Sequence, residues 1–234
     1  MVRKTGLIAA LDTQDPAQAT AWAQAVAPSA GAIKLGLEFA YAAGFQAVAD
    51  VAGSAPLFLD LKLHDIPNTV GSAIRALSYL RPKMLTLHAS GGRAMLEAAR
   101  KACDEAFPAN ARPALLAVTV LTSLDDQALA ETGITDGARA QVLRLGKLAI
   151  DAGIDGLVCS AHELAPLRDT LGDKPLLVTP GIRPAGSAAG DQKRIMTPTQ
   201  ARDAGADWIV VGRPITQAAD PAQAAAAIAA ELAA

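Results

Sequence analysis

Short apolar runs alternate with longer, alanine-rich segments along the chain. Eight such runs, each followed by a segment with helical spacing, is the number of units in a (β/α)8 barrel. Parallel strands that are covered on both faces should be almost continuously apolar, and these runs are. A doubly wound open sheet shows the same alternation but usually has fewer strands. We therefore predict an α/β fold, a (β/α)8 TIM barrel that forms one domain over residues 1–234, with strands at Leu7–Leu11, Ala32–Leu35, Leu57–Leu61, Met84–Leu87, Leu115–Val120, Gly156–Cys159, Leu176–Thr179 and Trp208–Val211.

Prolines mark the expected starts of three helices. Asp15 offers a capping carboxylate directly before Pro16, which suits the first helical position. Pro67 and Pro214 follow the third and the eighth apolar runs in the same way. The helix starts therefore support the unit boundaries that the apolar runs indicate.

One connection does not fit the alternation. Residues 181–197 show neither strand nor helix periodicity, and Gly181, Gly186 and Gly190 punctuate them. A structureless loop longer than about 12–15 residues is uncommon in a compact domain and is often a lid or a binding loop. We expect a lid here, with a disordered solvent loop as the alternative.

The composition excludes several classes of function. Hydrophobic residues make up 51% of the chain and charged residues 19%, which is enough apolar material for a sizeable core. A net charge of −2 leaves no basic excess to neutralise a nucleic-acid polymer. No stretch approaches the roughly 18–20 apolar residues of a membrane span, and the first apolar run ends at Asp12, too early for a signal peptide. We expect a soluble, cytoplasmic protein with neither a nucleic acid nor a membrane as its partner.

The metal-ligating residue types also show no persuasive spacing. Cys103 and Cys159 lie far apart among apolar neighbours, so buried thiols are expected rather than a disulfide framework or a zinc site. Asp12, Asp60 and Asp65 could hold Mg²⁺, but the lysines between them argue against a cation. We expect no metal ion.

The third apolar run carries the most informative polar residues. Side chains alternate between the two faces of a strand, so Asp60 and Lys62 should point toward the barrel axis together with Phe58. In this fold the functional site lies at the carboxyl ends of the strands. Lys34 on the neighbouring strand and Asp65 in the following loop should reach the same place. The pattern predicts a catalytic centre with an alternating charge array of Lys34, Asp60, Lys62 and Asp65.

A structural role for this array is the alternative. Buried ion pairs exist for packing or register, yet desolvation offsets much of their attraction, so stability alone is a poor reason for four converging charges. The alternative is strongest for Asp65, which could simply cap the helix that begins near Pro67.

The loops after the seventh and the eighth runs predict a phosphate site. These two loops form the usual phosphate site in such barrels. Gly212 would allow close backbone approach, and the amides at the start of the next helix could point at an anion. Arg183 and Arg213 could add bidentate contacts. Either arginine alone would more often be a solvated surface charge.

Other polar residues also follow the expected strands. Asp12 follows the first run, and Thr122 and Ser123 follow the fifth. His88 ends the fourth run and is either a core histidine or a functional one. His162 opens a helix and is expected at the surface.

At these positions the sequence resembles the orotidine 5′-phosphate decarboxylase family. The stretch Asp60-Leu61-Lys62-Leu63-His64-Asp65-Ile66-Pro67-Asn68-Thr69 is similar to the family signature, and the resemblance covers essentially the whole chain. The Asp-x-Lys-x-x-Asp core is shared with sugar-phosphate enzymes of the same superfamily. The His-Asp-Ile-Pro-Asn-Thr extension and the Gly181-Ile182-Arg183-Pro184 loop are more specific.

The resemblance implies a cofactor-free lyase that converts orotidine 5′-phosphate to uridine 5′-phosphate and CO₂ in de novo pyrimidine biosynthesis. Lys62 would donate the proton to C6, Asp60 would lie beside the substrate carboxylate, and Lys34 and Asp65 would complete the charge network. A homodimer is implied in which the second subunit supplies Asp65 and Thr69. The remaining substrate contacts would come from Asp12 and Lys34 at the ribose, Thr122 and Ser123 near ribose and base, and Arg183, Gln192, Gly212 and Arg213 at the phosphate, with Gln192 on the lid.

Two other functions stay open at this point. A Mg²⁺-dependent sugar-phosphate decarboxylase or synthase of the same superfamily would lose its activity in EDTA. A non-catalytic nucleotide-binding barrel would bind uridine monophosphate tightly without consuming the orotate chromophore.

Overall fold

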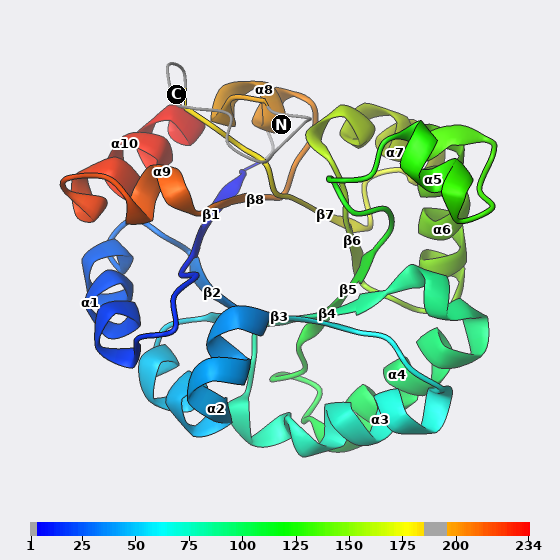
Figure 1. The fold of residues 1–234 in the computed structure, drawn as a ribbon, viewed down its shortest axis with the longest axis horizontal. Coiled ribbons are helices and arrows are strands. Elements are labelled where there is room, and N and C mark those ends of the chain that lie inside the picture. The colour runs from blue at the N-terminus through cyan, green and yellow to red at the C-terminus, as the bar shows by residue number, and fades with distance from the viewer. Residues whose placement is uncertain (1–3, 185–195) are drawn as a thin grey trace.

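Eight parallel strands close into a barrel in chain order, with the helices in a ring around them (Figure 1). The computed structural model describes residues 4–184 and 196–234. The first strand pairs with the eighth, so the sheet is continuous around the axis. This confirms the (β/α)8 barrel. The strands are β1 (Gly6–Ala10), β2 (Ala32–Gly36), β3 (Leu57–Leu63), β4 (Met84–His88), β5 (Ala114–Val118), β6 (Gly156–Val158), β7 (Leu176–Thr179) and β8 (Trp208–Val211).

The strand bounds differ from the apolar runs at two places that matter for the site. β5 ends at Val118, although Val120 is still buried, because apolar burial continues into the loop beyond the hydrogen-bonded ladder. β3 continues past Leu61 to Leu63. Its pairing with β4 shifts register between Leu59 and Leu63, so the extra length contains a bulge.

The helices begin where the sequence provides caps and prolines. The carboxylate of Asp15 accepts a hydrogen bond from the amide of Ala17, and Pro16 opens the first helix as expected. Pro67 opens α3, and Pro214 lies in the first turn of α9. The α-helices are α1 (Pro16–Val26), α2 (Leu37–Ala52), α3 (Pro67–Ala76), α4 (Gly92–Ala106), α5 (Asp126–Glu131), α6 (Gly137–Asp151), α7 (Leu164–Leu171), α8 (Pro198–Asp203), α9 (Arg213–Thr216) and α10 (Pro221–Ala233), with 3₁₀ turns η1 (Ser78–Leu80), η2 (Ala89–Gly91) and η3 (Ala161–Glu163).

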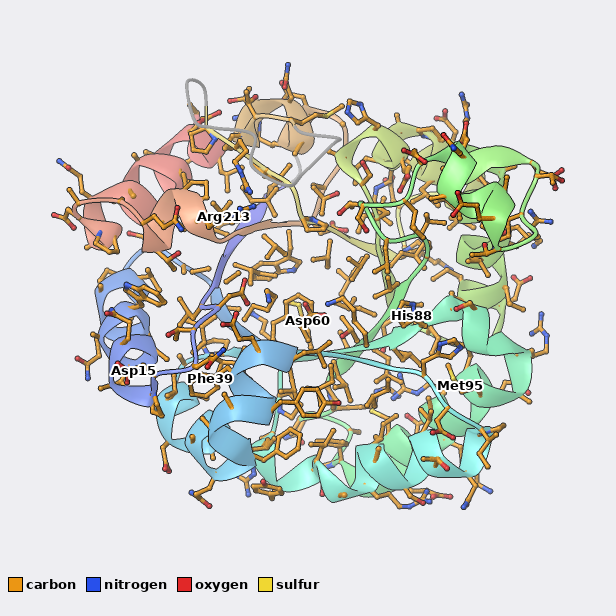
Figure 2. All side chains as sticks on the ribbon, viewed as in Figure 1. Asp15, Phe39, Asp60, His88, Met95 and Arg213 are labelled. Atoms are coloured by element: carbon orange, nitrogen blue, oxygen red, sulfur yellow. The ribbon has the colours of Figure 1, made fainter. Side chains whose placement is uncertain are left out.

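Apolar side chains form two separate layers. The larger layer lies between strands and helices and includes Leu57 and Leu59 of β3, while Phe39 and Met95 contribute to it from the helices (Figure 2). The smaller layer fills the barrel interior and includes Phe58. The predicted alternation along β3 is therefore confirmed for its apolar residues. Because the inner layer fills the barrel axis, polar groups are left to its carboxyl-terminal mouth.

Trp208 closes the opposite, amino-terminal end of the barrel. Glycines occupy the neighbouring positions because a Cβ atom at Gly6 or Gly31 would collide with the indole ring. The ammonium of Lys83 lies 4.6 Å from the ring centroid, a cation–π contact. In the described part of the chain, no helix is both long and apolar enough to cross a membrane.

Candidate active site

A cavity of about 520 Å³ opens at the carboxyl-terminal mouth of the barrel. Its floor is the top of the inner apolar layer, with Phe58 and Val210 among the lining residues. Asp60 lies near the centre of the barrel opening (Figure 2). The sequence-predicted residues that the structure brings together around this cavity are Asp12, Lys34, Asp60, Lys62, Thr122, Arg183, Gly212 and Arg213.

The charged groups in the cavity alternate in sign. The Asp60 Oδ2 atom lies 2.8 Å from Lys62 Nζ and 3.5 Å from Lys34 Nζ. Lys34 Nζ also donates to Asp12 Oδ1 at 3.0 Å. The side chains of Asp60 and Lys34 are each only 12% exposed, so water screens their attraction weakly. The observed array runs Asp12, Lys34, Asp60 and Lys62, so Asp12 extends the predicted charges at the Lys34 end.

Burial and pairing have opposite effects on the pKa values of Asp60 and Lys34. Burial raises the pKa of Asp60, but attraction to Lys34 and Lys62 outweighs it, so the pKa lies below its usual value. Burial lowers the pKa of Lys34, but attraction to Asp60 and Asp12 outweighs it, so the pKa lies above its usual value. Both groups therefore remain charged at neutral pH.

The backbone of Lys62 has an uncommon conformation. Its φ angle is +51°, a left-handed value that costs a non-glycine residue roughly 1–2 kcal/mol. Its amide donates to Thr86 Oγ1 at 2.9 Å. The Thr86 hydroxyl in turn donates to Asp60 Oδ1 at 2.9 Å. Sequence reasoning missed Thr86, although a threonine inside the apolar run of β4 was the available indication.

Asp65 and Thr69 lie outside this cavity. Both residues are exposed, and Asp65 Oδ1 accepts from the amide of Ile66 at 2.6 Å. The residue that precedes α3 is Ile66, and no side chain caps that helix, so the interpretation of Asp65 as a helix cap is wrong. Within a single chain, Asp65 does not line the cavity that holds the charge array. Ser123 is exposed beside Thr122 and does not line the cavity.

Two arginines bring positive charge to one wall of the cavity. Arg183 is only 8% exposed, and its Nη1 atom donates to its neighbour's carbonyl at Ile182. Burial lowers the pKa of Arg183, and repulsion from Arg213 lowers it further, so the two guanidinium groups feel each other's charge. An anion between them would relieve that repulsion.

The helix after β8 is short. α9 has only four residues, and Gly212 directly precedes it. Gly212 lines the cavity. The start of α9 and the two arginine side chains therefore face the same cavity.

The stems of the expected lid lie side by side. Ile182 and Met196 form an isolated parallel bridge, and the amide of Arg183 donates to the Met196 carbonyl at 3.0 Å. Gln192 lies outside the described residues, as does most of the segment 181–197. The bridge fixes the backbone of Arg183 where the loop leaves the barrel.

Several residues line or flank the cavity without having been singled out. Glu38, Cys159 and Gln217 line it, and a Cβ atom at Gly36 would lie 3.1 Å from Lys34 Nζ. Gly36 therefore leaves room for the ammonium group. Glu38 and Gln217 carry no distinctive motif, so only the folded barrel identifies them.

The histidines and cysteines fall into simple classes. His88 is half-buried with its ring centroid 5.3 Å from that of His64, and mainly burial lowers its pKa. His162 is exposed, and Cys103 and Cys159 are buried, as expected. Burial raises the pKa of Cys103 to about 11. Within the described ranges, no group of three His, Cys, Asp or Glu residues is arranged to hold a metal ion.

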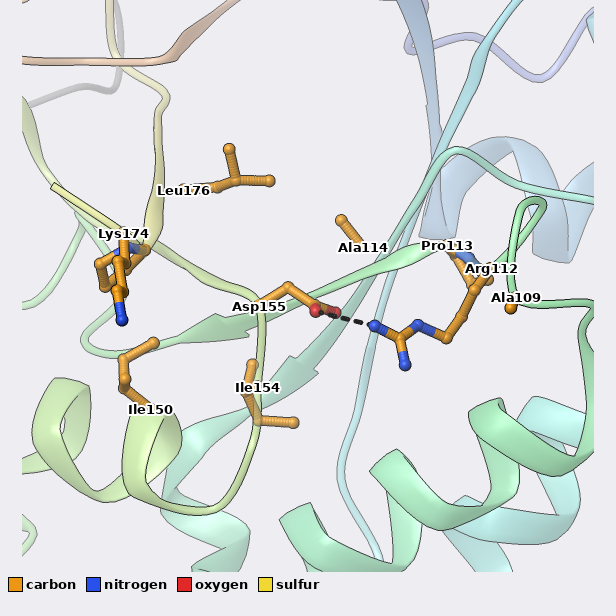
Figure 3. A pocket seen from close by; sticks show the side chains of 10 residues that line it. Ala109, Arg112, Pro113, Ala114, Ile150, Ile154, Asp155, Lys174 and Leu176 are labelled. Carbon is orange, nitrogen blue, oxygen red and sulfur yellow. Dashed lines mark ion pairs between the residues drawn. The ribbon is translucent and has the colours of Figure 1, made fainter.

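A second hollow of about 480 Å³ lies at the other end of the barrel, before β5, β6 and β7 (Figure 3). Arg112 and Asp155 form an ion pair across it at 3.7 Å. Asp155 also accepts from Arg100 and from the amide of Leu115. These contacts tie the strand entries together, which is a structural role typical of this end of a barrel.

A closed barrel with buried alternating charges and paired arginines at its carboxyl-terminal mouth defines a (β/α)8-barrel enzyme. The family model "Orotidine 5'-phosphate decarboxylase / HUMPS family" matches residues 5–228. The chain belongs to this family.

Proteins of similar sequence and structure match this chain over nearly its full length. A protein of Gluconobacter oxydans (strain 621H), named orotidine 5'-phosphate decarboxylase, is 63% identical over 100% of this chain and 99% of its own length. A protein of the same name from Rhodospirillum rubrum is 54% identical over 95% of this chain and 92% of its own length. The crystal structure of orotidine 5'-phosphate decarboxylase from Lactobacillus acidophilus superposes with a TM-score of 0.88 at 39% identity, covering 98% of this chain and 100% of that one.

The charge of Asp60 should make stability depend on pH. We expect Asp60→Asn to lower the free energy of unfolding by about 3 kcal/mol at pH 7, because it removes the negative charge that compensates Lys34 and Lys62. The pKa of Asp60 in the folded chain is below the ordinary value of 3.8, so its stabilisation is present above that pH and is lost as the pH falls through the folded pKa. Urea unfolding between pH 3 and pH 7 measures the difference between the two proteins.

Asp136→Asn is the matched control, since Asp136 pairs with Arg144 on the surface and should affect stability little at any pH. An Asp60→Asn deficit that stays constant from pH 7 to pH 3 would contradict the expectation.

Proposed function

We propose that this chain decarboxylates orotidine 5′-phosphate to uridine 5′-phosphate and CO₂, with Lys62 as the proton donor. The observation that carries the proposal is the Lys62 ammonium, held 2.8 Å from the buried carboxylate of Asp60 inside the cavity mouth. Membership of the family, at 63% identity to a relative of that name, supplies the substrate. We place the reaction in the cytoplasm, in the synthesis of pyrimidine nucleotides, carried out by a single barrel domain.

The main barrier of the proposed reaction is the negative charge that forms on one carbon atom, C6. The bond from C6 to the carboxylate breaks, CO₂ leaves, and the electron pair stays on C6 in the plane of the ring. The Lys62 ammonium then transfers a proton to C6, and the resulting amine regains a proton from water. The reaction needs no oxidant, reductant or cofactor for its balance.

The stabilisation by Lys62 would be selective for the transition state. Two unit charges about 4 Å apart attract by roughly 4 kcal/mol at an effective dielectric of 20. This attraction to C6 appears only as the carbanion forms, so it lowers the barrier rather than strengthening substrate binding. Asp60 would hold the ammonium in place, and its repulsion of the substrate carboxylate would fade as CO₂ leaves.

Substrate contacts away from C6 would supply binding energy. We assign the phosphate to Arg183 and Arg213, with the backbone at Gly212, and we assign the ribose hydroxyls to Asp12 and Lys34. Thr122 and Ser123 would approach ribose and base, and Gln192 would reach the phosphate from the lid. A grip on the remote phosphate can drive lid closure and hold the reacting groups together.

We also propose a homodimer in which each copy completes the other's site. Leu37 and Tyr41 lie four residues apart on one face of α2, with Tyr41 84% exposed, and Phe45, also exposed, follows a break in the helix at Gly44. Ile66, beside Asp65, is 67% exposed. Large exposed apolar side chains on α2 and directly before α3 are candidates for a protein interface. A two-fold partner seated there would carry its Asp65 and Thr69 toward the cavity of the first copy.

Lys62→Ala should abolish decarboxylation while uridine monophosphate still binds, because only the proton donor and its charge are lost. Loss of orotate absorbance in the presence of EDTA measures the activity, and titration calorimetry measures binding. Lys147→Ala, on the exposed surface of α6, is the control and should behave as wild type. Near-normal turnover of Lys62→Ala would sink the assignment, and wild-type activity that EDTA removes would favour the Mg²⁺-dependent alternative.

Arg213→Ala should raise KM for the phosphorylated substrate about 100-fold or more, since a charge-assisted contact to phosphate contributes about 3 kcal/mol. Binding of the phosphate-free nucleoside should change little. Arg144→Ala, on the exposed face of α6, controls for the loss of a positive charge. An equal loss for nucleoside and nucleotide would count against a phosphate role for Arg213.

Mixing two inactive variants tests the shared site. Lys62→Ala and Asp65→Ala should each be inactive alone, but a mixed dimer has one site with both native residues. After subunit exchange at equal concentrations, half the dimers are mixed, so about a quarter of wild-type activity should return. A mixture that stays inactive, while sedimentation shows exchanged dimers, would contradict the placement of Asp65 in the partner's site.

A further inference from the structure

The pairing of β3 with β4 breaks beside the proposed proton donor. Leu59 pairs with Leu85 and Leu63 pairs with Leu87, so three residues of β3, namely 60–62, lie opposite Thr86 alone. On its other side β3 keeps regular register with β2 as far as Asp60. The bulge is therefore confined to the edge that faces β4, and it contains both Asp60 and Lys62.

The side chain of Thr86 fills the gap that the bulge leaves. Its hydroxyl accepts from the Lys62 amide at 2.9 Å and donates to Asp60 Oδ1 at 2.9 Å. The chemistry fixes both directions, since an amide can only donate and an ionised carboxylate can only accept. Thr86 is fully buried at 0% exposure, so water does not compete for either bond.

These two bonds complete a closed ring of contacts. Asp60 Oδ2 meets Lys62 Nζ at 2.8 Å, while Asp60 Oδ1 and the Lys62 amide both meet the Thr86 hydroxyl. The ring fixes the main chain and the side chain of Lys62 against one carboxylate. It also gives the Lys62 amide a side-chain partner at a φ of +51°, where the pairing of β3 with β4 shifts register.

We propose that Thr86 is a positioning residue for the reaction, and that its hydroxyl fixes Lys62 and Asp60 in the relative orientation that proton transfer requires. This inference rests on the proposed decarboxylation. Thr86 does not line the cavity, so it acts through the two residues that do.

Three variants separate positioning from packing. Thr86→Val keeps the size of the side chain and removes both hydrogen bonds, whereas Thr86→Ser keeps the hydroxyl. Thr5→Val is the matched control, because Thr5 is another buried threonine, whose hydroxyl donates to the Ala206 carbonyl at 2.7 Å near the far end of the barrel. Each variant is assayed for kcat and KM, for uridine monophosphate binding and for unfolding in urea.

Thr86→Val should lower kcat about 10- to 100-fold, the effect of a small misplacement of reacting groups, with KM within about threefold of wild type. Thr86→Ser should stay within about threefold of wild type in kcat. The acidic limb of the pH profile of kcat/KM should move to higher pH in Thr86→Val, because the Thr86 hydrogen bond helps to lower the pKa of Asp60. Thr5→Val should lose stability while its kcat and pH profile stay unchanged.

A Thr86→Val enzyme with wild-type kcat, or a Thr86→Ser enzyme as slow as Thr86→Val, would overturn the inference. Hydrogen exchange at the Lys62 amide of the wild-type chain adds a test that needs no variant to fold. The amide should exchange as slowly as those of neighbouring strand residues. Fast exchange in an active enzyme would overturn the role of Thr86 but leave the proposed function standing. A wild-type chain that leaves orotidine 5′-phosphate intact would overturn the proposed function instead, and with it the role of Thr86 in this reaction.

Discussion

The carboxylate of Asp60 holds two lysine ammonium groups at a place that solvent barely reaches, and the rest of the site depends on this contact. Removing charges from water is costly, and attraction recovers that free energy only when the groups are held in good geometry. Here the geometry comes from two adjacent strands of a rigid barrel and from the hydroxyl of a third. The fold therefore maintains an arrangement of charges that a flexible chain would hydrate and separate.

The charges also divide the cavity into regions of different chemistry. Alternating charges occupy the wall at β1, β2 and β3, and the paired arginines follow β7 and β8. A substrate with an anionic group at each end could span these regions. Because Arg183 stands on a loop and Arg213 opens the short helix α9, while both lysines stand on strands, binding can adjust at one end while the reacting end stays fixed.

The sequence predicts some of these features well because they depend on short-range periodicity. Side chains alternate along β3 with a period of two, so the sequence alone predicts that Phe58, Asp60 and Lys62 point into the barrel. The bulge and the partnership with Thr86 could not be predicted in this way, since register is a property of two strands that are distant in the chain. Asp65 shows the same limit. Its neighbours suggested that it caps α3, but the capping position is occupied by Ile66, and no side chain caps the helix.

The pairing of β1 with β8 restricts how this molecule can associate with others. An open sheet presents unpaired amides and carbonyls at its margins, and any second chain can extend it by main-chain hydrogen bonding. Closure leaves this sheet with no such margin. Another copy can therefore be recognised only through side chains and loops on the outside of the barrel. A substitution there can change the choice of partner without disturbing the backbone hydrogen bonds of the sheet.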